Sequence, residues 1–99
     1  MSSDEDTDLW EMAGFVKGGS HRFDVFCYLA RNGAAIPSDV AEETDKTQQR
    51  VYDAQQALQE RNLIELKVPE TMKKGRLHAL TDRGQEVWNF IVEKGIVGE

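Results

Sequence analysis

The sequence contains one cysteine, Cys27, and only two prolines among its 99 residues. A single cysteine cannot form a disulfide within the chain, and it excludes a zinc site built on cysteines of one chain. No run of about 18 apolar residues occurs, so no transmembrane helix is predicted. The first residues are acidic, whereas a secretory signal peptide begins with basic ones. We therefore expect a soluble, cytoplasmic protein without membrane contact.

Basic residues are also scarce, since 12 Lys and Arg stand against 18 Asp and Glu and the formal net charge is −6. The acids are concentrated near the start, where five acids and no base occur in the first 11 residues. Between residues 46 and 83, however, eight bases stand against five acids. This basic half remains compatible with a polyanionic partner. The acidic remainder also suits a halophilic cytoplasm, where carboxylates would hold monovalent cations.

The beginning of the chain divides into two parts. Residues 1–8 are polar and acidic, which predicts disorder. Residues 9–19 contain an apolar cluster with Leu9, Trp10 and Phe15, ended by two glycines. This cluster is too short to form a stable helix alone, so we expect it to pack on another surface.

Three helices are predicted between residues 20 and 61. Ser20, Pro37 with Ser38, and Thr47 favour helix starts, and Asn32-Gly33 favours an end of the first helix. The third helix, from about 47 to 61, has an apolar line and an opposite face rich in hydrogen-bonding groups. That face contains Gln48, Gln49, Arg50, Tyr52, Asp53, Gln55, Gln56 and Gln59.

A hairpin and a final helix are predicted next. Strands over 63–68 and 76–80 flank a loop with Lys73 and Lys74 at its tip. Thr81 is the expected N-cap of a helix that ends at Gly95. This helix carries five large apolar residues in six positions, more than one face of a small domain can bury. We expect part of it to meet a second subunit.

Three local patterns carry a family resemblance. Leu58–Glu65 resembles the pattern L-x-E-x-G-L-I, with Asn62 in the glycine position, where a positive φ is tolerated. Leu80–Val87 is similar to L-T-x-x-G, and Pro37–Glu42 resembles x-S-x-I-A-E. In this order, over about residues 20–92, the chain resembles MarR-like and PadR-like winged helix-turn-helix regulators. Its acidic composition resembles that of haloarchaeal proteins.

The resemblance implies an α+β fold with a three-helix helix-turn-helix core, a β-hairpin wing and a C-terminal dimerisation helix. The implied domains are 9–19 as a dimer contact, 20–80 as the winged helix, and 81–99 as the dimerisation helix. The implied function is a homodimeric, sequence-specific DNA-binding transcription regulator, acting as a repressor on a pseudo-palindromic operator.

The residues expected to contact DNA lie in two groups. The recognition helix and its start would supply Lys46, Thr47, Gln48, Gln49, Arg50 and Tyr52, and the wing would supply Lys73, Lys74 and Arg76. The expected dimer contacts are Leu9, Trp10, Phe15, Val87, Trp88 and Ile91.

Two alternatives remain open from the sequence. One is a winged-helix module that docks proteins without binding DNA, and the other is a sensor acting through Cys27 or through a pocket between dimer helices. Neither an enzyme nor a cofactor is expected, because no nucleophile with a base and no glycine-rich phosphate loop can be assembled. His21 and His78 are interpreted as a helix-start and a surface residue, so no metal site is expected.

Overall fold

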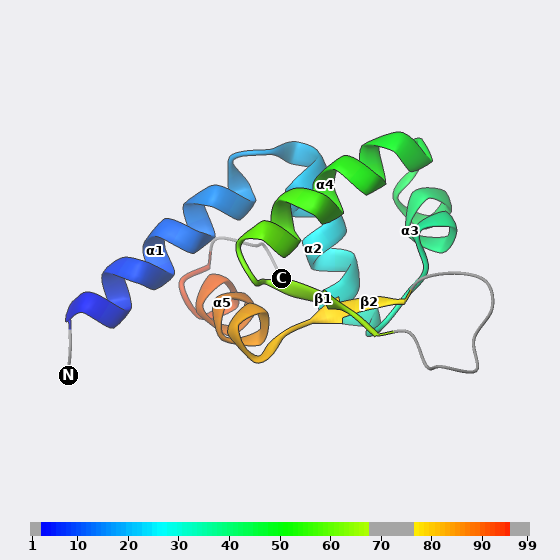
Figure 1. Cartoon of the computed structure of the whole chain (residues 1–99). Helices are drawn as coiled ribbons and strands as arrows, with labels where there is room; N and C mark the ends of the chain where they lie inside the picture. The colour runs from blue at the N-terminus through cyan, green and yellow to red at the C-terminus, as the bar shows by residue number, and fades with distance from the viewer. Residues whose placement is uncertain (1–2, 68–76, 96–99) are drawn as a thin grey trace.

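The computed structural model describes residues 3–67 and 77–95, with side chains from residue 8 onward. Within these ranges the order of elements is helix, helix, short helix, helix, hairpin, helix (Figure 1). The elements are α1 (Ser3–Lys17), α2 (Ser20–Asn32), α3 (Pro37–Thr44), α4 (Gln48–Glu60), β1 (Ile64–Leu66), β2 (His78–Leu80) and α5 (Asp82–Glu93). The α+β class expected from the sequence is confirmed. No helix in the described part has both the length and the apolar character needed to cross a membrane.

The helix starts follow local chemistry. The Thr47 side chain accepts a hydrogen bond from the Arg50 backbone N–H, at 3.2 Å, and so caps α4 as predicted. Helix α2 differs by one residue, because Gly19 is its N-cap and Ser20 its first helical residue. Asp45 separates α3 from α4 in a left-handed conformation, with φ 60°.

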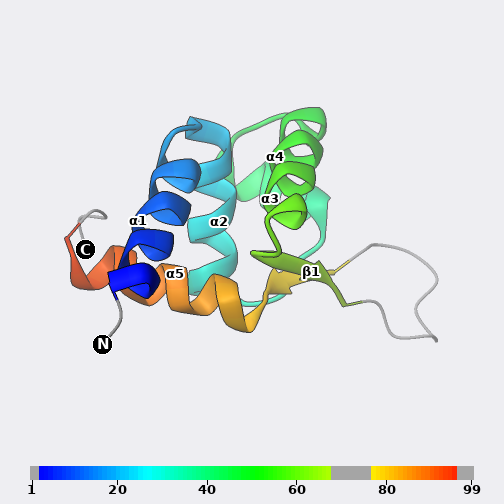
Figure 2. The same cartoon turned by 60° about the vertical axis from the view of Figure 1, so that its left-hand side comes forward.

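The core lies where α1, α2, α4 and α5 meet (Figure 2). Phe26 and Leu29 of α2 are fully buried, as are Val51 and Leu58 of α4. Because these apolar positions are spaced three, four or seven residues apart, they form one stripe on each helix. The stripes orient α4 so that its opposite side faces solvent.

The hairpin is antiparallel, with Ile64 opposite Leu80 and Leu66 opposite His78. Ala35 extends the sheet by pairing with His78 in both directions, at 3.1 and 3.0 Å. Asn62 adopts a φ of 61° just before β1, which confirms the left-handed conformation expected for this glycine-like position.

The expected disorder of residues 1–8 is wrong for residues 3–8, because α1 begins at Ser3. The acidic composition of its first turns suits the positive end of a helix dipole. Tertiary contacts supply the rest of the stabilisation of α1, since Ala13 and Val16 are buried in the core against neighbouring helices. Asp8 also forms an ion pair with Arg83 of α5. The partner surface expected for this segment is therefore found within the same chain.

Several residues expected at a dimer contact instead belong to this chain's own packing. Val87 and Ile91 are fully buried, so they offer no surface to a second subunit, and that expectation is wrong for them. Phe15 lies between the guanidinium groups of Arg22 and Arg61, each 4.2 Å from its ring centre. Most of the large apolar side chains of α5 therefore pack on α1 and α2 of the same chain.

Candidate nucleic-acid interface

Helix α4 presents an exposed polar line opposite the core. Val51, Ala54 and Leu58 point inward, and at 3.6 residues per turn Gln49 and Gln56 point in the opposite direction. Both glutamines are exposed, and the Tyr52 side chain beside them is about half-exposed. The line therefore offers amide and hydroxyl groups that can hydrogen-bond to base edges.

Asp53 belongs to the same surface, although it was not among the residues expected to contact DNA. Its Oδ1 accepts a hydrogen bond from the Gln49 side-chain amide, at 3.0 Å. The spacing of four residues was the available signal, because such residues are neighbours on a helix. This bond orients the Gln49 amide, and a carboxylate at this position could accept a hydrogen bond from cytosine.

The three expected contacts at the start of α4 have different environments. Gln48 and Thr47 are exposed, but the Thr47 hydroxyl is engaged in the helix cap. Lys46 is not free for a phosphate, because its Nζ lies 2.8 Å from Asp24 Oδ2 and its side chain is only 12% exposed. This ion pair fastens the turn between α3 and α4 to α2.

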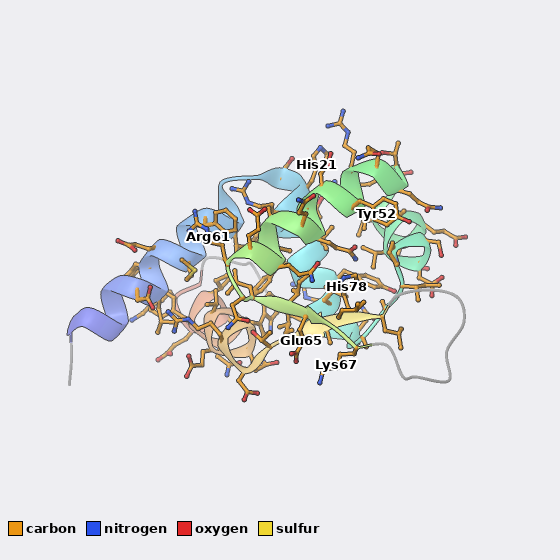
Figure 3. All side chains as sticks on the ribbon, viewed as in Figure 1. His21, Tyr52, Arg61, Glu65, Lys67 and His78 are labelled. Carbon is orange, nitrogen blue, oxygen red and sulfur yellow. The ribbon has the colours of Figure 1, made fainter. Side chains whose placement is uncertain are left out.

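The basic tip of the hairpin, with Lys73, Lys74 and Arg76, lies outside the described residues. At the described base of the hairpin, Lys67 forms an exposed ion pair with Glu65, at 3.4 Å. Figure 3 places these two side chains at the lower end of the sheet, on a different part of the surface from Tyr52.

A shallow hollow of about 270 Å³ separates α4 from the hairpin. It is lined by Pro37, Tyr52, Gln55, Gln56, Gln59 and His78. Gln55 was expected on the polar face, but it is 2% exposed and its Nε2 has no hydrogen-bond partner among the residues that the structure describes. His78 was expected at the surface and is buried, because its backbone pairs with both Leu66 and Ala35.

Replacing Gln55 with methionine is expected to raise the free energy of unfolding by about 1 kcal/mol. The substitution removes a buried amide donor that has no partner and keeps the length of the side chain. Chemical denaturation measures the change. Gln56→Met is the matched control, since the neighbouring glutamine is exposed and its replacement should leave stability nearly unchanged. A loss of stability in Gln55→Met would show that the amide is satisfied in solution.

Cys27 has the properties of a core residue. The side chain is buried in the middle of α2, and burial raises the pKa of its thiol, with Arg31 acting in the opposite direction and Asp24 adding to the rise. A raised pKa disfavours the thiolate, which is the reactive form in redox sensing.

The Cys27 thiol is expected to contribute a pH-dependent part of the stability. The unfolded thiol ionises near pH 8.5, and the folded chain holds the same proton more tightly. The contribution of the thiol to the free energy of unfolding is fully present below that pH, and it is lost as the pH rises through the pKa that the thiol has in the folded chain. The free energy of unfolding of the wild type should therefore fall more between pH 8 and pH 10 than that of Cys27→Ala. Rapid alkylation of the folded wild type at pH 8 would contradict the assignment.

No group of three His, Cys, Asp or Glu side chains within the described ranges is arranged to hold a metal ion.

No protein-family model and no curated protein sequence matches this chain. Solved structures do match it. A MarR family regulator from Neisseria meningitidis superposes with a TM-score of 0.68 at 22% identity, over 96% of this chain and 73% of its own. The fold is that of the MarR-family winged helices. NadR in complex with 4-hydroxyphenylacetate gives a TM-score of 0.73 at 17% identity, over 89% of this chain and 62% of its own.

A MepR–DNA complex from S. aureus gives a TM-score of 0.70 at 16% identity, over 92% of this chain and 76% of that chain. The winged helix-turn-helix expected from the sequence is thus confirmed as the fold. In winged-helix terms α3 and α4 form the helix-turn-helix, α4 occupies the recognition position, and β1 and β2 form the base of the wing.

Proposed function

We propose that this chain is a transcription regulator that inserts α4 into the major groove of double-stranded DNA. The observation that carries the proposal is the exposed line of Gln49, Tyr52 and Gln56 on the recognition helix. A glutamine amide can bond both edge atoms of adenine. The fold is similar to that of MepR, whose structure has been solved in complex with DNA, and this similarity also supports the proposal.

We also propose that the chain acts as a homodimer and represses transcription by covering a promoter. The face formed by α1 and α5 supports this. Trp10 is half-exposed and meets the Phe90 ring edge to face, with ring centres 4.8 Å apart. Leu9 and Phe90 also line a surface hollow of about 390 Å³, whose remaining lining residues are the polar and charged Arg83, Glu86, Asn89, Glu93 and Lys94. A second copy on this face would place two α4 helices in successive major grooves of a pseudo-palindrome.

Selection of duplexes from a random pool by the purified protein tests DNA recognition. We expect an enriched motif with two half-sites roughly one helical turn apart. The selection is run in both low and molar KCl, because the acidic composition suits a halophilic, archaeal cytoplasm in which bound cations would bridge carboxylates to phosphates. No enrichment in either salt would favour protein docking, which predicts that Gln49→Ala leaves function intact.

Substitution of Trp10 by lysine is expected to shift the protein from dimer to monomer, because a half-exposed indole on the proposed contact is replaced by a hydrated charge. Sedimentation velocity measures the shift, and DNA affinity should fall with it. Tyr52→Lys is the control for the oligomeric state alone, since Tyr52 is equally exposed but lies on the α4 face. A monomeric wild type would remove the dimer from the proposal.

A further inference from the structure

Arg50 makes an unusual contact between two helices. Its Nη1 lies 3.2 Å from Nε2 of His21, which stands at the start of α2. A guanidinium can only donate hydrogen bonds, so His21 accepts through Nε2 and carries its proton on Nδ1. That Nδ1 is buried and has no hydrogen-bond partner within the described part of the chain.

Arg50 also differs from the other arginines of the described part of the chain. Each of those has an acidic, carbonyl or aromatic partner: Arg83 with Asp8, Arg22 with the Phe15 carbonyl, Arg61 with the Phe15 ring and Arg31 with Trp88. The carboxylate nearest in sequence on the same helix, Asp53, accepts a hydrogen bond from Gln49 instead. The exposed charge of Arg50 is thus left for an external anion.

The surroundings of the pair favour a phosphate. Gly19, Ser20, His21 and Arg50 line a hollow of about 180 Å³, which Arg22 and Asp53 also border. The first backbone N–H groups of a helix have no partner within it, and no side chain caps α2. A helix start of this kind attracts anions, and here it adds to the charge already supplied by Arg50.

Arg50 points away from the line of base-reading groups. Tyr52 stands two positions further along α4, which is about 200° around an α-helix. Figure 3 shows His21 and Tyr52 on opposite sides of the α4 ribbon. A side chain on the α2 flank therefore meets the rim of the groove, where the phosphates lie.

We propose that Arg50 and His21, together with the start of α2, hold one backbone phosphate and read no base. This proposal rests on the proposed DNA binding and gives Arg50 a role different from guanine recognition. It predicts that Arg50 contributes to affinity on every sequence alike.

Fluorescence anisotropy on the selected duplex and its single-base variants, across a series of KCl concentrations, tests the role. Arg50→Ala should weaken binding to all variants by a similar factor and reduce the slope of log K against log salt by about 2, which is about 1 for each subunit of the proposed dimer. Gln56→Ala is the matched variant, which should change the ranking of the base variants and keep the slope. His21→Ala should weaken binding less than Arg50→Ala, again without changing the ranking.

Replacing single phosphates by neutral methylphosphonates locates the contact. At one position in each half-site the wild type should lose affinity while Arg50→Ala loses none. If Arg50→Ala instead relaxes preference at one base pair with an unchanged salt slope, the phosphate role is overturned while DNA binding stands. If the wild type binds no duplex, the proposed function itself fails. A different outcome would be that inorganic phosphate raises the melting temperature of the wild type but not of Arg50→Ala, while the two proteins have the same DNA salt slope. That result would assign the site to a free anion and overturn the DNA role.

Discussion

Replacing Gly84 by alanine is expected to destabilise the chain by more than about 4 kcal/mol, a loss that few single substitutions cause. A Cβ at this position would lie 2.1 Å from the Leu63 carbonyl oxygen, far below the 3.0 Å that real contacts respect. The neighbouring atom is backbone, so no side chain can rotate away. Total stability of a domain this size is about 5–15 kcal/mol, so the substitution should remove a large part of it.

The physical reason lies in the way α5 begins. The Thr81 hydroxyl accepts a hydrogen bond from the Gly84 N–H, at 2.9 Å, and donates one to the Asn62 carbonyl, at 2.6 Å. The Thr81 N–H also donates to the Leu63 carbonyl, at 3.1 Å. These bonds draw the first turn of α5 onto the chain that leads into β1. The threonine and the glycine of the L-T-x-x-G pattern are therefore parts of one joint.

Thermal unfolding followed by circular dichroism measures the effect. Gly14→Ala is the control, because Gly14 lies in α1 and nothing stands within 4 Å of its added Cβ. Alanine there should stabilise the helix by up to about 1 kcal/mol. A melting temperature of Gly84→Ala within a few degrees of the wild type would mean that α5 does not pack on Leu63 as described.

Replacing Gln56 by glutamate is expected to weaken binding to the selected operator about 100-fold, which corresponds to about 2.7 kcal/mol. The substitution keeps the size of the side chain but removes the amide donor. It also brings a negative charge against base edges and phosphates. A well-placed bidentate amide contributes roughly 1–3 kcal/mol of discrimination, and an unpaired charge in the groove adds to the loss.

The matched control is Gln85→Glu on α5. Both glutamines are exposed on helices, and each follows an aspartate three residues earlier, Asp53 or Asp82. Both substitutions exchange an amide for a carboxylate and so change the net charge equally, while only Gln56 lies on the proposed groove-facing line. Both variants should keep the melting temperature of the wild type. Equal DNA affinity of the two variants would remove α4 from the interface.

Local sequence patterns were sufficient for much of the fold. The spacing of Val51, Ala54 and Leu58 predicted the buried side of α4, and Thr47 and Thr81 predicted two helix starts. These features depend on helix periodicity and on hydrogen bonds within one turn, so neighbouring residues suffice to specify them. The exposed glutamines of α4 followed from the same periodicity.

The tertiary structure decided what depends on residues far apart in the chain. Residues 3–8 are helical because α1 packs on α5 and α2, and Val87 and Ile91 are buried for the same reason. Lys46 is paired with Asp24 of α2, and Arg50 contacts His21, 29 positions away. Charge and hydrogen-bonding capacity are visible in a sequence. Which side chain pairs with a given charge or hydrogen-bonding group depends on the distances between side chains, and these distances are set only when the helices pack.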